Sequence, residues 1–350
     1  MSLTAFFSHL LFAAGLIVLA SLITRLMLSK VRIMDMPNPR SSHEVPKPKS
    51  GGISIVVTFL IGTIVIFFVA DATMIRQDYF FAFVFSGVLI AAISLYDDVK
   101  NKPFPVKLGT QLVAVFIVLA SGLVIDELAL PYLGAMPLGW LSYPVSFLWI
   151  VGLTNAFNFM DGLDGLMGGV AVIVSAFFCV ITFTQGSHFV YITSYTLLAG
   201  ALGFMFFNFP PARIFMGDVG SAFLGFAFAV LAIIAARYDR SHTSFLVMPL
   251  LLFNVIYDTF FTFARRLIRG DQVTAPHRTH LYQLFNRLGY SHRTVGFFHY
   301  AVCCCQGAAA FWMTKIPGAQ RMLIFLPFLV FQILYSYVIL SRAKRAGLLL

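Results

Sequence analysis

The stretch Asn155-Ala-Phe-Asn-Phe-Met-Asp-Gly-Leu-Asp-Gly-Leu-Met-Gly-Gly169 places two carboxylates between two almost uncharged apolar runs. A charge inside a bilayer costs several kcal/mol, so these carboxylates must lie at an interface or in a water-filled cavity. On a helix, their three-residue spacing would put Asp161 and Asp164 on one face, within reach of one cation. The alternative is an interfacial helix cap, with Asp161 accepting hydrogen bonds from free N–H groups.

The composition around this stretch is that of a membrane protein. The chain is 59% hydrophobic and 11% charged, whereas soluble domains carry about 25% charged residues. We therefore expect an all-α polytopic membrane protein, folded as one membrane-embedded domain over residues 1–350. Eleven apolar runs are long enough to span a bilayer: 3–28, 51–70, 79–96, 108–125, 143–160, 166–184, 189–207, 221–236, 244–263, 294–313 and 322–340.

The positive charges predict the orientation, because Lys and Arg concentrate in cytoplasmic loops. If alternate loops face the cytoplasm, that side holds 19 of the 24 Lys and Arg residues. The N-terminus is then outside and the C-terminus is cytoplasmic. Topology signalling alone explains most of this charge, and the remainder would attract anionic lipid or an anionic substrate.

The first predicted cytoplasmic loop, 35–52, contains four prolines and ends in Gly51-Gly52. The prolines favour an extended segment. The glycines would open the next helix with bare N–H groups that favour an anion, close to Lys47 and Lys49. A plain basic loop is the alternative.

Further carboxylates end or begin other predicted helices on the same side. Asp97 and Asp98 are adjacent at a helix C-terminus, where they repel each other and oppose the helix dipole. Nearby Lys100, Lys107 or a divalent cation would compensate for that charge. Carboxylates without cysteine or clustered histidine indicate Mg²⁺ or Mn²⁺ rather than zinc. Asp218 lies between glycines before a later span, either as an N-cap or in a ligand-facing loop.

The ninth run and the loop after it carry the remaining candidates. Asp258 is an intramembrane carboxylate, with Asn254 one turn earlier as its expected neighbour. The loop contains His277, Arg278 and His280, and a guanidinium group binds phosphate in a bidentate manner. These residue types suit a ligand rich in phosphate.

The chain resembles the polyprenyl-phosphate N-acetylhexosamine-1-phosphate transferase family (glycosyltransferase family 4), which includes the phospho-muramoyl-pentapeptide translocase. The resemblance covers nearly the whole chain and rests on motifs that occur in order on one predicted face. They are the Pro-Asn-Pro-Arg…Gly-Gly loop at 37–52, Asp97-Asp98 with Lys107, Asn158-Phe-Met-Asp161-Gly-Leu-Asp164-Gly, and Asn208…Phe215-Met-Gly-Asp218. The span layout is most similar to the bacterial branch that initiates O-antigen and related surface glycans.

The resemblance implies transfer of N-acetylhexosamine-1-phosphate from a UDP-sugar to undecaprenyl phosphate, with release of UMP. It implies an enzyme of the bacterial inner membrane whose active site faces the cytoplasm and uses Mg²⁺. No nucleic-acid partner is implied, and the sequence leaves monomer or homodimer open. Phosphoryl transfer needs acids that hold the metal and bases that hold phosphate, and both are present.

The roles that the resemblance implies fall into three groups. The metal ligands are Asp218 and Asp161. The catalytic residues are Asp97, Asp98, Asp161 and His280, with Asp97 either orienting and deprotonating the acceptor or acting as a covalent nucleophile. The substrate-binding residues are Lys49, Lys107, Asn158, Asp164, Asn208, Phe215, His277 and Arg278.

One motif departs from the family. That branch often ends its last cytoplasmic motif in His-x-His-His, whereas this chain has His280-Leu-Tyr-Gln283. The later histidines therefore have no counterpart, and the difference points to another sugar donor, such as a deoxy N-acetylhexosamine. A transporter or a lipid flippase would be the alternative classes, but a transporter should place its ionisable groups near the midplane on repeated helices.

Overall fold

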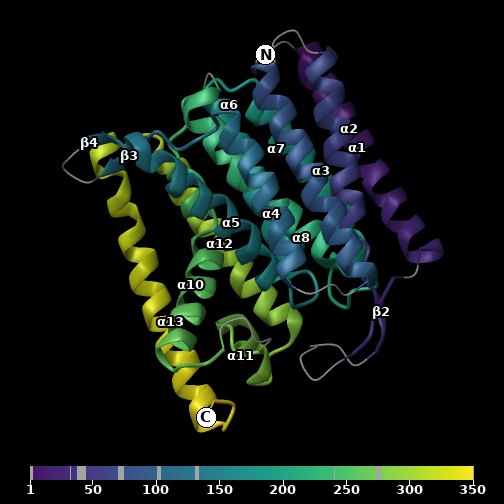
Figure 1. Ribbon diagram of the computed structural model, residues 1–350. Helices are drawn as coiled ribbons and strands as arrows, with labels where there is room; N and C mark the ends of the chain where they lie inside the picture. The colour runs from purple at the N-terminus through teal and green to yellow at the C-terminus, as the bar shows by residue number, and fades with distance from the viewer. Residues whose placement is uncertain are drawn as a thin grey trace.

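Each apolar run predicted from the sequence contains helix in the computed structural model of the protein (Figure 1), although 121–125 and 244–246 are not helical. The structure describes residues 3–31, 33–37, 45–69, 75–100, 104–130, 134–239, 241–272 and 277–349. Part of the Pro-Asn-Pro-Arg motif, residues 38–40, lies outside the described residues. The first seven helices are α1 (Leu3–Lys30), α2 (Gly52–Val69), α3 (Gln77–Lys100), α4 (Phe104–Ala120), α5 (Ser142–Met160), α6 (Leu166–Thr184) and α7 (Phe189–Asn208).

The second half of the chain adds one central helix and a more irregular set. Its helices are α8 (Gly217–Ile233), α9 (Val247–Leu251), α10 (Phe253–Ile268), α11 (Leu281–Arg287), α12 (His292–Met313) and α13 (Phe325–Arg345). A π-helical turn, η2 (Ile234–Tyr238), continues α8, and the short 3₁₀ segments η1 (Gly139–Leu141) and η3 (Gly318–Ile324) precede α5 and α13. The predicted run 244–263 is thus two helices, α9 and α10, which meet at Leu252.

Among the described residues, eight helices are long and apolar enough to cross a membrane. The remaining three predicted runs form α4, α5 and the α9–α10 pair. The prediction of an all-α polytopic membrane protein is confirmed, while the count of eleven spans stays a prediction. Two short antiparallel hairpins, each of two strands, complete the fold: β1 (Met34–Asp35) with β2 (Lys47–Pro48), and β3 (Glu127–Leu130) with β4 (Gly134–Pro137).

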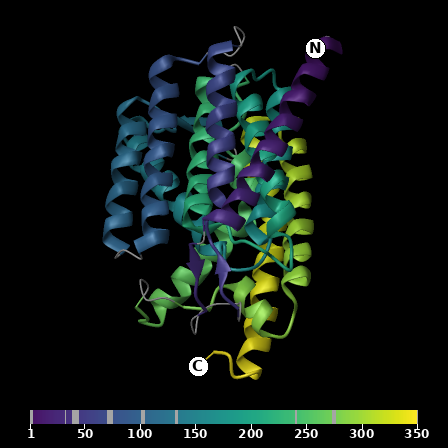
Figure 2. The same cartoon turned by 90° about the vertical axis from the view of Figure 1, so that its right-hand side faces the viewer.

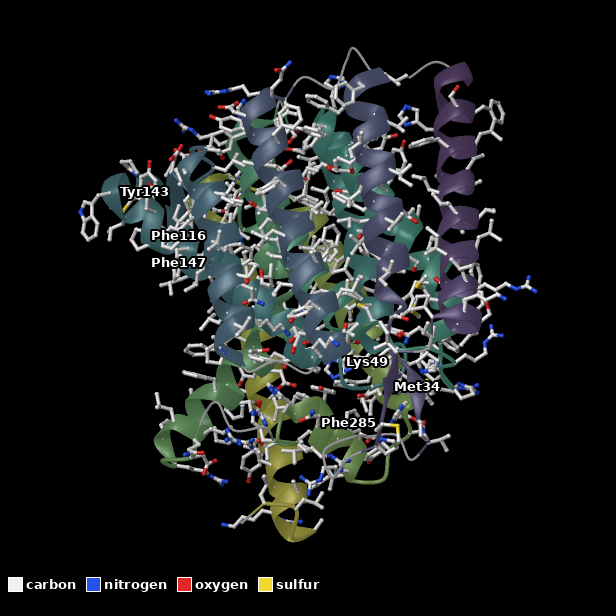
Figure 3. All side chains as sticks on the ribbon, turned by 45° about the vertical axis from the view of Figure 1, so that its right-hand side comes forward. Met34, Lys49, Phe116, Tyr143, Phe147 and Phe285 are labelled. Atoms are coloured by element: carbon white, nitrogen blue, oxygen red, sulfur yellow. The ribbon has the colours of Figure 1, made fainter. Side chains whose placement is uncertain are left out.

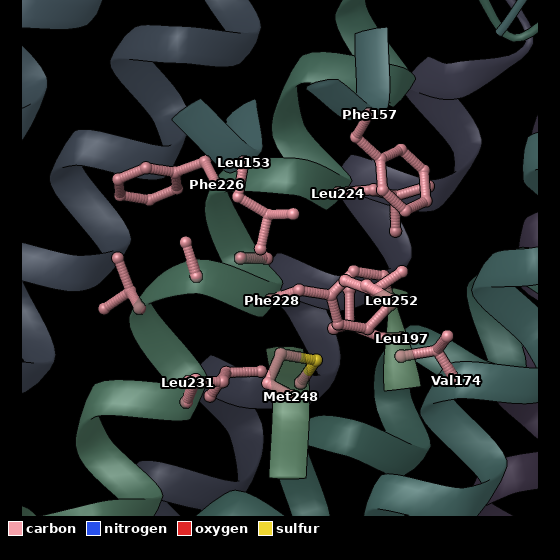
Figure 4. Close-up of a cluster of buried hydrophobic side chains, with 14 of the residues drawn as sticks. Leu153, Phe157, Val174, Leu197, Leu224, Phe226, Phe228, Leu231, Met248 and Leu252 are labelled. Carbon is pink, nitrogen blue, oxygen red and sulfur yellow. The ribbon is translucent and has the colours of Figure 1, made fainter. Parts of the chain in front are cut away.

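Helix α8 is the centre of the bundle. In its apolar window 94% of the residues are buried, against 22% in α1 and in the segment containing α13, which lie at the periphery. Figure 4 shows the core around it, where side chains from α5, α6, α7 and α9 meet those of α8. The central position of α8 matters because its first turn carries Asp218.

The two ends of the bundle differ. The termini lie at opposite ends (Figure 2), and the β1–β2 hairpin, α11 and the C-terminus share one of them, which we call the C-terminal end (Figure 1). Figure 3 shows Met34, Lys49 and Phe285 at that end and Tyr143 near the other. The basic loops predicted to be cytoplasmic are therefore brought to one end of the molecule.

The Gly51-Gly52 pair does not offer free N–H groups to an anion. Gly51 and Gly52 donate to the carbonyl oxygens of Phe215 and Met216, over 3.0 and 2.8 Å. A side chain at Gly52 would collide with the backbone of Gly220. The expectation of an anion site on these N–H groups was wrong, because the glycines are used to bring the start of α2 against α8.

Candidate active site

A polar cavity of about 220 Å³ lies at the C-terminal end, where the ends of α3, α5 and α7 meet the start of α8. Seven of the residues predicted from the sequence line it: Lys49, Asp98, Asp161, Asn208, Phe215, Asp218 and Arg278. They come from segments that are up to 229 residues apart in the chain. The structure therefore gathers the separate motifs around one space.

Asp218 is held by side chains of two other helices. Lys107 of α4 donates to one carboxylate oxygen of Asp218, and the Asn158 amide of α5 donates to the other over 2.9 Å. Lys107 also donates to Asn158 Oδ1 over 3.0 Å. The N-cap alternative for Asp218 is wrong, because its carboxylate is bound by side chains and α8 has no side-chain cap.

Asp98 reaches the same cavity from the last turn of α3. Lys49 Nζ lies 3.7 Å from its Oδ1, and the N–H of Val219 donates to its Oδ2 over 3.2 Å. Gly217 packs against Lys49 and Asp98 with φ +72°, and a side chain at this position would collide with the Lys49 carbonyl oxygen and the Asp98 carboxylate. Lys49 thus compensates this acidic group, whereas Lys100, Lys107 or a divalent cation was predicted to do so; Lys107 instead pairs with Asp218.

Asp161 lies in a turn that follows α5, not on a helix. The segment 161–165 separates α5 from α6, so the expectation that Asp161 and Asp164 share one helical face was wrong. The alternative, a helix cap formed by Asp161, is not present either, since Gly165 is the N-cap of α6. Burial raises the pKa of Asp161 to about 8, and the negative charges of Asp218 and Asp98 add to this effect. Such a carboxylate is one that a bound cation would stabilise.

The cavity suits a Mg²⁺ ion by its donor chemistry. Protein sites usually hold Mg²⁺ through one or two carboxylates together with substrate phosphates and water. Asp161 and Asp218 line the same cavity and provide such ligands. In the part of the chain that the structure describes, no three acidic, histidine or cysteine side chains are already gathered as a metal site. Asp161 and Asp218 are thus the residues that could hold such an ion.

Asp164 turns away from the cavity. Its Oδ2 accepts from the Ala212 N–H over 3.0 Å and lies 3.3 Å from Lys47 Nζ, while His292 Nδ1 is 3.5 Å from its Oδ1. Burial alone would raise the pKa of Asp164, but these hydrogen bonds and charges hold it below its ordinary value. Asp164 thereby ties the 161–165 turn to the loop before α8 and to the β1–β2 hairpin.

The Phe215 ring, predicted to bind the nucleotide, is half-buried at the cavity wall. Lys47 Nζ lies 5.1 Å from the centre of this ring, a cation–π distance. Asn208, behind it, accepts from the Gly165 N–H over 3.1 Å and donates to Ile214 O over 2.9 Å. Both ends of the Asn208 amide therefore support the loops that hold Phe215 in place.

The segment before α11 lies to one side of the cavity. His280 is buried with its Nδ1 3.2 Å from Asp258 Oδ1. Asp258 also accepts from the N–H groups of Leu281 and Tyr282, over 2.9 and 3.0 Å. Asp258 thus holds the start of α11 in place, and the side chain that pairs with Asp258 is His280. The expected neighbour Asn254 instead contacts His299, with Nδ2 3.3 Å from Nδ1.

His277 and His280 line a second, apolar groove of about 730 Å³ rather than the polar cavity. Helices α4, α5 and α10 form its walls, with residues such as Leu108, Leu148, Gly152, Phe159, Phe260 and Phe263. Burial, and then the charge of His280 and two arginines, lower the pKa of His277 to about 4. At neutral pH His277 is therefore uncharged, and Arg266 is the cation at this end of the groove.

The structure also reveals residues that sequence reasoning did not assign. Asp35, Gln283 and Asn286 line the polar cavity. Two signals were available: Asp35 opens the proline-rich loop, and Gln283 ends the altered motif His280-Leu-Tyr-Gln283. Asn286 had no such signal, because α11 is too short to stand out. Asp97, beside Asp98 on α3, is half-buried and is not among the cavity-lining residues. Its predicted role stays a prediction.

Comparison with known proteins gives a consistent picture. The family model for glycosyl transferase family 4 matches residues 80–236. A probable undecaprenyl-phosphate N-acetylglucosaminyl 1-phosphate transferase of Bacillus subtilis is 33% identical over 267 residues, which cover 75% of this chain and 72% of that protein. An undecaprenyl-phosphate alpha-N-acetylglucosaminyl 1-phosphate transferase of Thermotoga maritima is 29% identical over 299 residues, 79% and 87% of the two chains. A phospho-N-acetylmuramoyl-pentapeptide-transferase of Acetivibrio thermocellus is 43% identical over 132 residues, 36% and 40% of the two chains.

Proposed function

Because the chain belongs to glycosyl transferase family 4, we propose that it transfers N-acetylhexosamine-1-phosphate from a UDP-sugar to undecaprenyl phosphate, releasing UMP. The chain is a multi-pass membrane transferase of the polyprenyl-phosphate sugar-phosphate type. Its relatives carry undecaprenyl or decaprenyl phosphate in their names. The UDP-sugar donor and the reaction mechanism are part of the proposal.

One observation carries this proposal: an acidic and basic cavity adjoins an apolar groove at the start of α11. The polar cavity suits a soluble nucleotide sugar, and the apolar groove suits a polyprenyl chain. Phe260, which is 71% exposed, and Phe263 on α10 give the groove a wall that lipid can reach. The acceptor would lie along α5 and α10 with its phosphate toward Arg266 and the cavity.

The residues around the cavity supply what phosphoryl transfer requires. Charge neutralisation and positioning dominate this reaction. Lys49 and Arg278 line the cavity and would bind phosphate oxygens, while Phe215 would stack on the uracil ring. Mg²⁺, when bound by Asp161 and Asp218, would neutralise the charge of the donor diphosphate. Lys107 and Asn158 keep Asp218 at the cavity wall.

We propose that the acceptor phosphate attacks the sugar-bearing phosphorus directly. The new phosphorus–oxygen bond forms on the lipid phosphate as the bond to UMP breaks, so UMP leaves with the bridging oxygen. A phosphate monoester has its second pKa at about 6, so the acceptor is mostly dianionic at neutral pH. Asp97 would remove any residual proton or orient the acceptor.

The site is proposed to face the cytoplasm of a bacterial inner membrane. The basic loops lie at the C-terminal end with the cavity, as the charge rule requires of a cytoplasmic face. UDP-sugars are made in the cytoplasm, so this orientation gives the donor direct access. We further propose that the product starts O-antigen or a related surface glycan, and loss of the gene should remove that glycan.

The test is a reconstituted assay with the purified protein in lipid nanodiscs. UMP should appear only when a UDP-N-acetylhexosamine, undecaprenyl phosphate and Mg²⁺ are all present. Chelation should stop the reaction, and Mg²⁺ or Mn²⁺ should restore it. A panel of UDP-sugars with GlcNAc, GalNAc and 6-deoxy sugars would identify the donor. Absence of acceptor-dependent UMP release with every donor would overturn the proposal.

A further inference from the structure

One side chain belongs to the walls of both spaces. Gln283, on the first turn of α11, lines the polar cavity together with Asp161 and Arg278. It also lines the apolar groove, together with Phe159 and His280. Among the described residues it is the one lining residue that the two spaces share. Two substrates that enter from opposite sides and react with each other must meet close to this side chain.

The orientation of Gln283 is set by the helix that it begins. Its Oε1 accepts from the His280 backbone N–H over 3.3 Å, in a capping box at the start of α11. The acceptor oxygen of the amide is therefore used by the backbone. The amide nitrogen carries two N–H donors that the capping box does not use. These donors can reach a phosphate oxygen of a ligand.

The neighbouring residues restrict this role to Gln283. Tyr282 is fully buried, and its hydroxyl donates to Phe159 O over 3.0 Å, which holds α11 against α5. The His280 ring is buried against Asp258. Gln283 is half-buried and thus the residue of this group that a ligand can contact from either space.

We propose that Gln283 donates a hydrogen bond to the acceptor phosphate where it meets the nucleotide sugar. The inference rests on the proposed function, since it takes the groove as the site of the polyprenyl chain. An amide suits this position because it binds a phosphate oxygen without adding charge and without titrating. The neighbouring Arg266 and Arg278 then provide the positive charge on the two sides.

The experiment separates the donor role of Gln283 from its capping role. Gln283→Glu keeps an oxygen for the His280 N–H, and a glutamate at this position also suits the helix N-terminus. The variant loses the N–H donors and faces phosphate with a negative charge. We expect a KM for undecaprenyl phosphate raised about 10- to 100-fold, the range for a lost hydrogen bond to a charged group. The KM for the UDP-sugar should change much less, and the Tm should not fall.

Two further variants complete the test. Gln320→Glu, at an exposed position in η3 near the other end of the bundle, adds the same charge and should leave both KM values unchanged. Gln283→His should make the acceptor KM depend on pH between about 6 and 7, where histidine titrates. An unchanged acceptor KM in Gln283→Glu with intact Tm overturns the inference, as does a rise confined to the UDP-sugar KM. If the wild-type protein shows no acceptor-dependent UMP release, the proposed function fails instead.

Discussion

The Asn158 amide donates to the Asp218 carboxylate over 2.9 Å and so joins the end of α5 to the start of α8. Lys107 of α4 contacts both residues. Three helices are therefore fixed to one point at the rim of the cavity. A carboxylate held in this way has little freedom, which is what a metal ligand of an active site requires.

Asp218→Asn should fold and insert but lose several orders of magnitude in activity. The amide can still contact Asn158, whereas it is a poor ligand for Mg²⁺. UMP release at saturating Mg²⁺ measures the effect. The matched control is Asp78→Asn, because Asp78 pairs with Arg76 on the exposed surface at the other end of α3. Near-normal turnover of Asp218→Asn would remove Asp218 from the metal site.

Phe215→Ala should raise the KM for the UDP-sugar more than it lowers kcat. Stacking of a base on an aromatic ring is worth about 1–3 kcal/mol, so the KM should rise roughly 5- to 150-fold. Phe206→Ala, which truncates an exposed ring on α7, serves as the control. An effect on the lipid KM alone would place Phe215 in the acceptor pocket.

Asp164→Asn should destabilise the protein in a pH-dependent manner. Because the folded state lowers the pKa of Asp164, its carboxylate stabilises the fold above the unfolded pKa of about 3.9. That contribution is lost as the pH falls through the lower, folded-state pKa. The Tm difference between wild type and variant, measured by intrinsic fluorescence in detergent, should be full near neutral pH and shrink in acid. Asp271→Asn, at an exposed position after α10, should show no such trend.

Asp97→Asn should be impaired mainly at low pH and recover partly above about pH 7. The acceptor phosphate is then already ionised and needs no base. The measurement is kcat/KM for undecaprenyl phosphate as a function of pH. A covalent route through Asp97 predicts no recovery, and it predicts UMP release without lipid. A phospho-sugar adduct trapped on Asp97 would decide against direct attack.

The membrane fold could be predicted from the sequence because each helix has to satisfy its backbone within the bilayer by itself. The boundaries of α6, 166–184, were predicted to the residue, and those of α5 and α7 to within one residue. The split of 244–263 into α9 and α10 was not predicted. The one local signal is Pro249, three residues before the junction at Leu252, because a proline inside a helix removes a backbone hydrogen bond.

The sequence by itself determined which chemical groups the site contains. Carboxylates and bases at the ends of apolar runs are costly, so their positions stand out without any structure. It did not determine which of them face the same space. Asp161 and Asp164 are three residues apart, yet the turn after α5 directs one to the cavity and the other to Ala212 and Lys47.

Only the tertiary structure decided the roles of the residues around the start of α11. Asp258 and His280 contact each other, and Asp258 also accepts a hydrogen bond from the backbone at the start of α11. Two residues of types common in active sites therefore have structural partners here. Gln283, which the sequence marked only as a departure from the His-x-His-His motif, lines both the polar cavity and the apolar groove. The physical reason is that contacts between distant segments depend on packing and on which polar groups already have hydrogen-bond partners. Neither can be predicted from the local sequence.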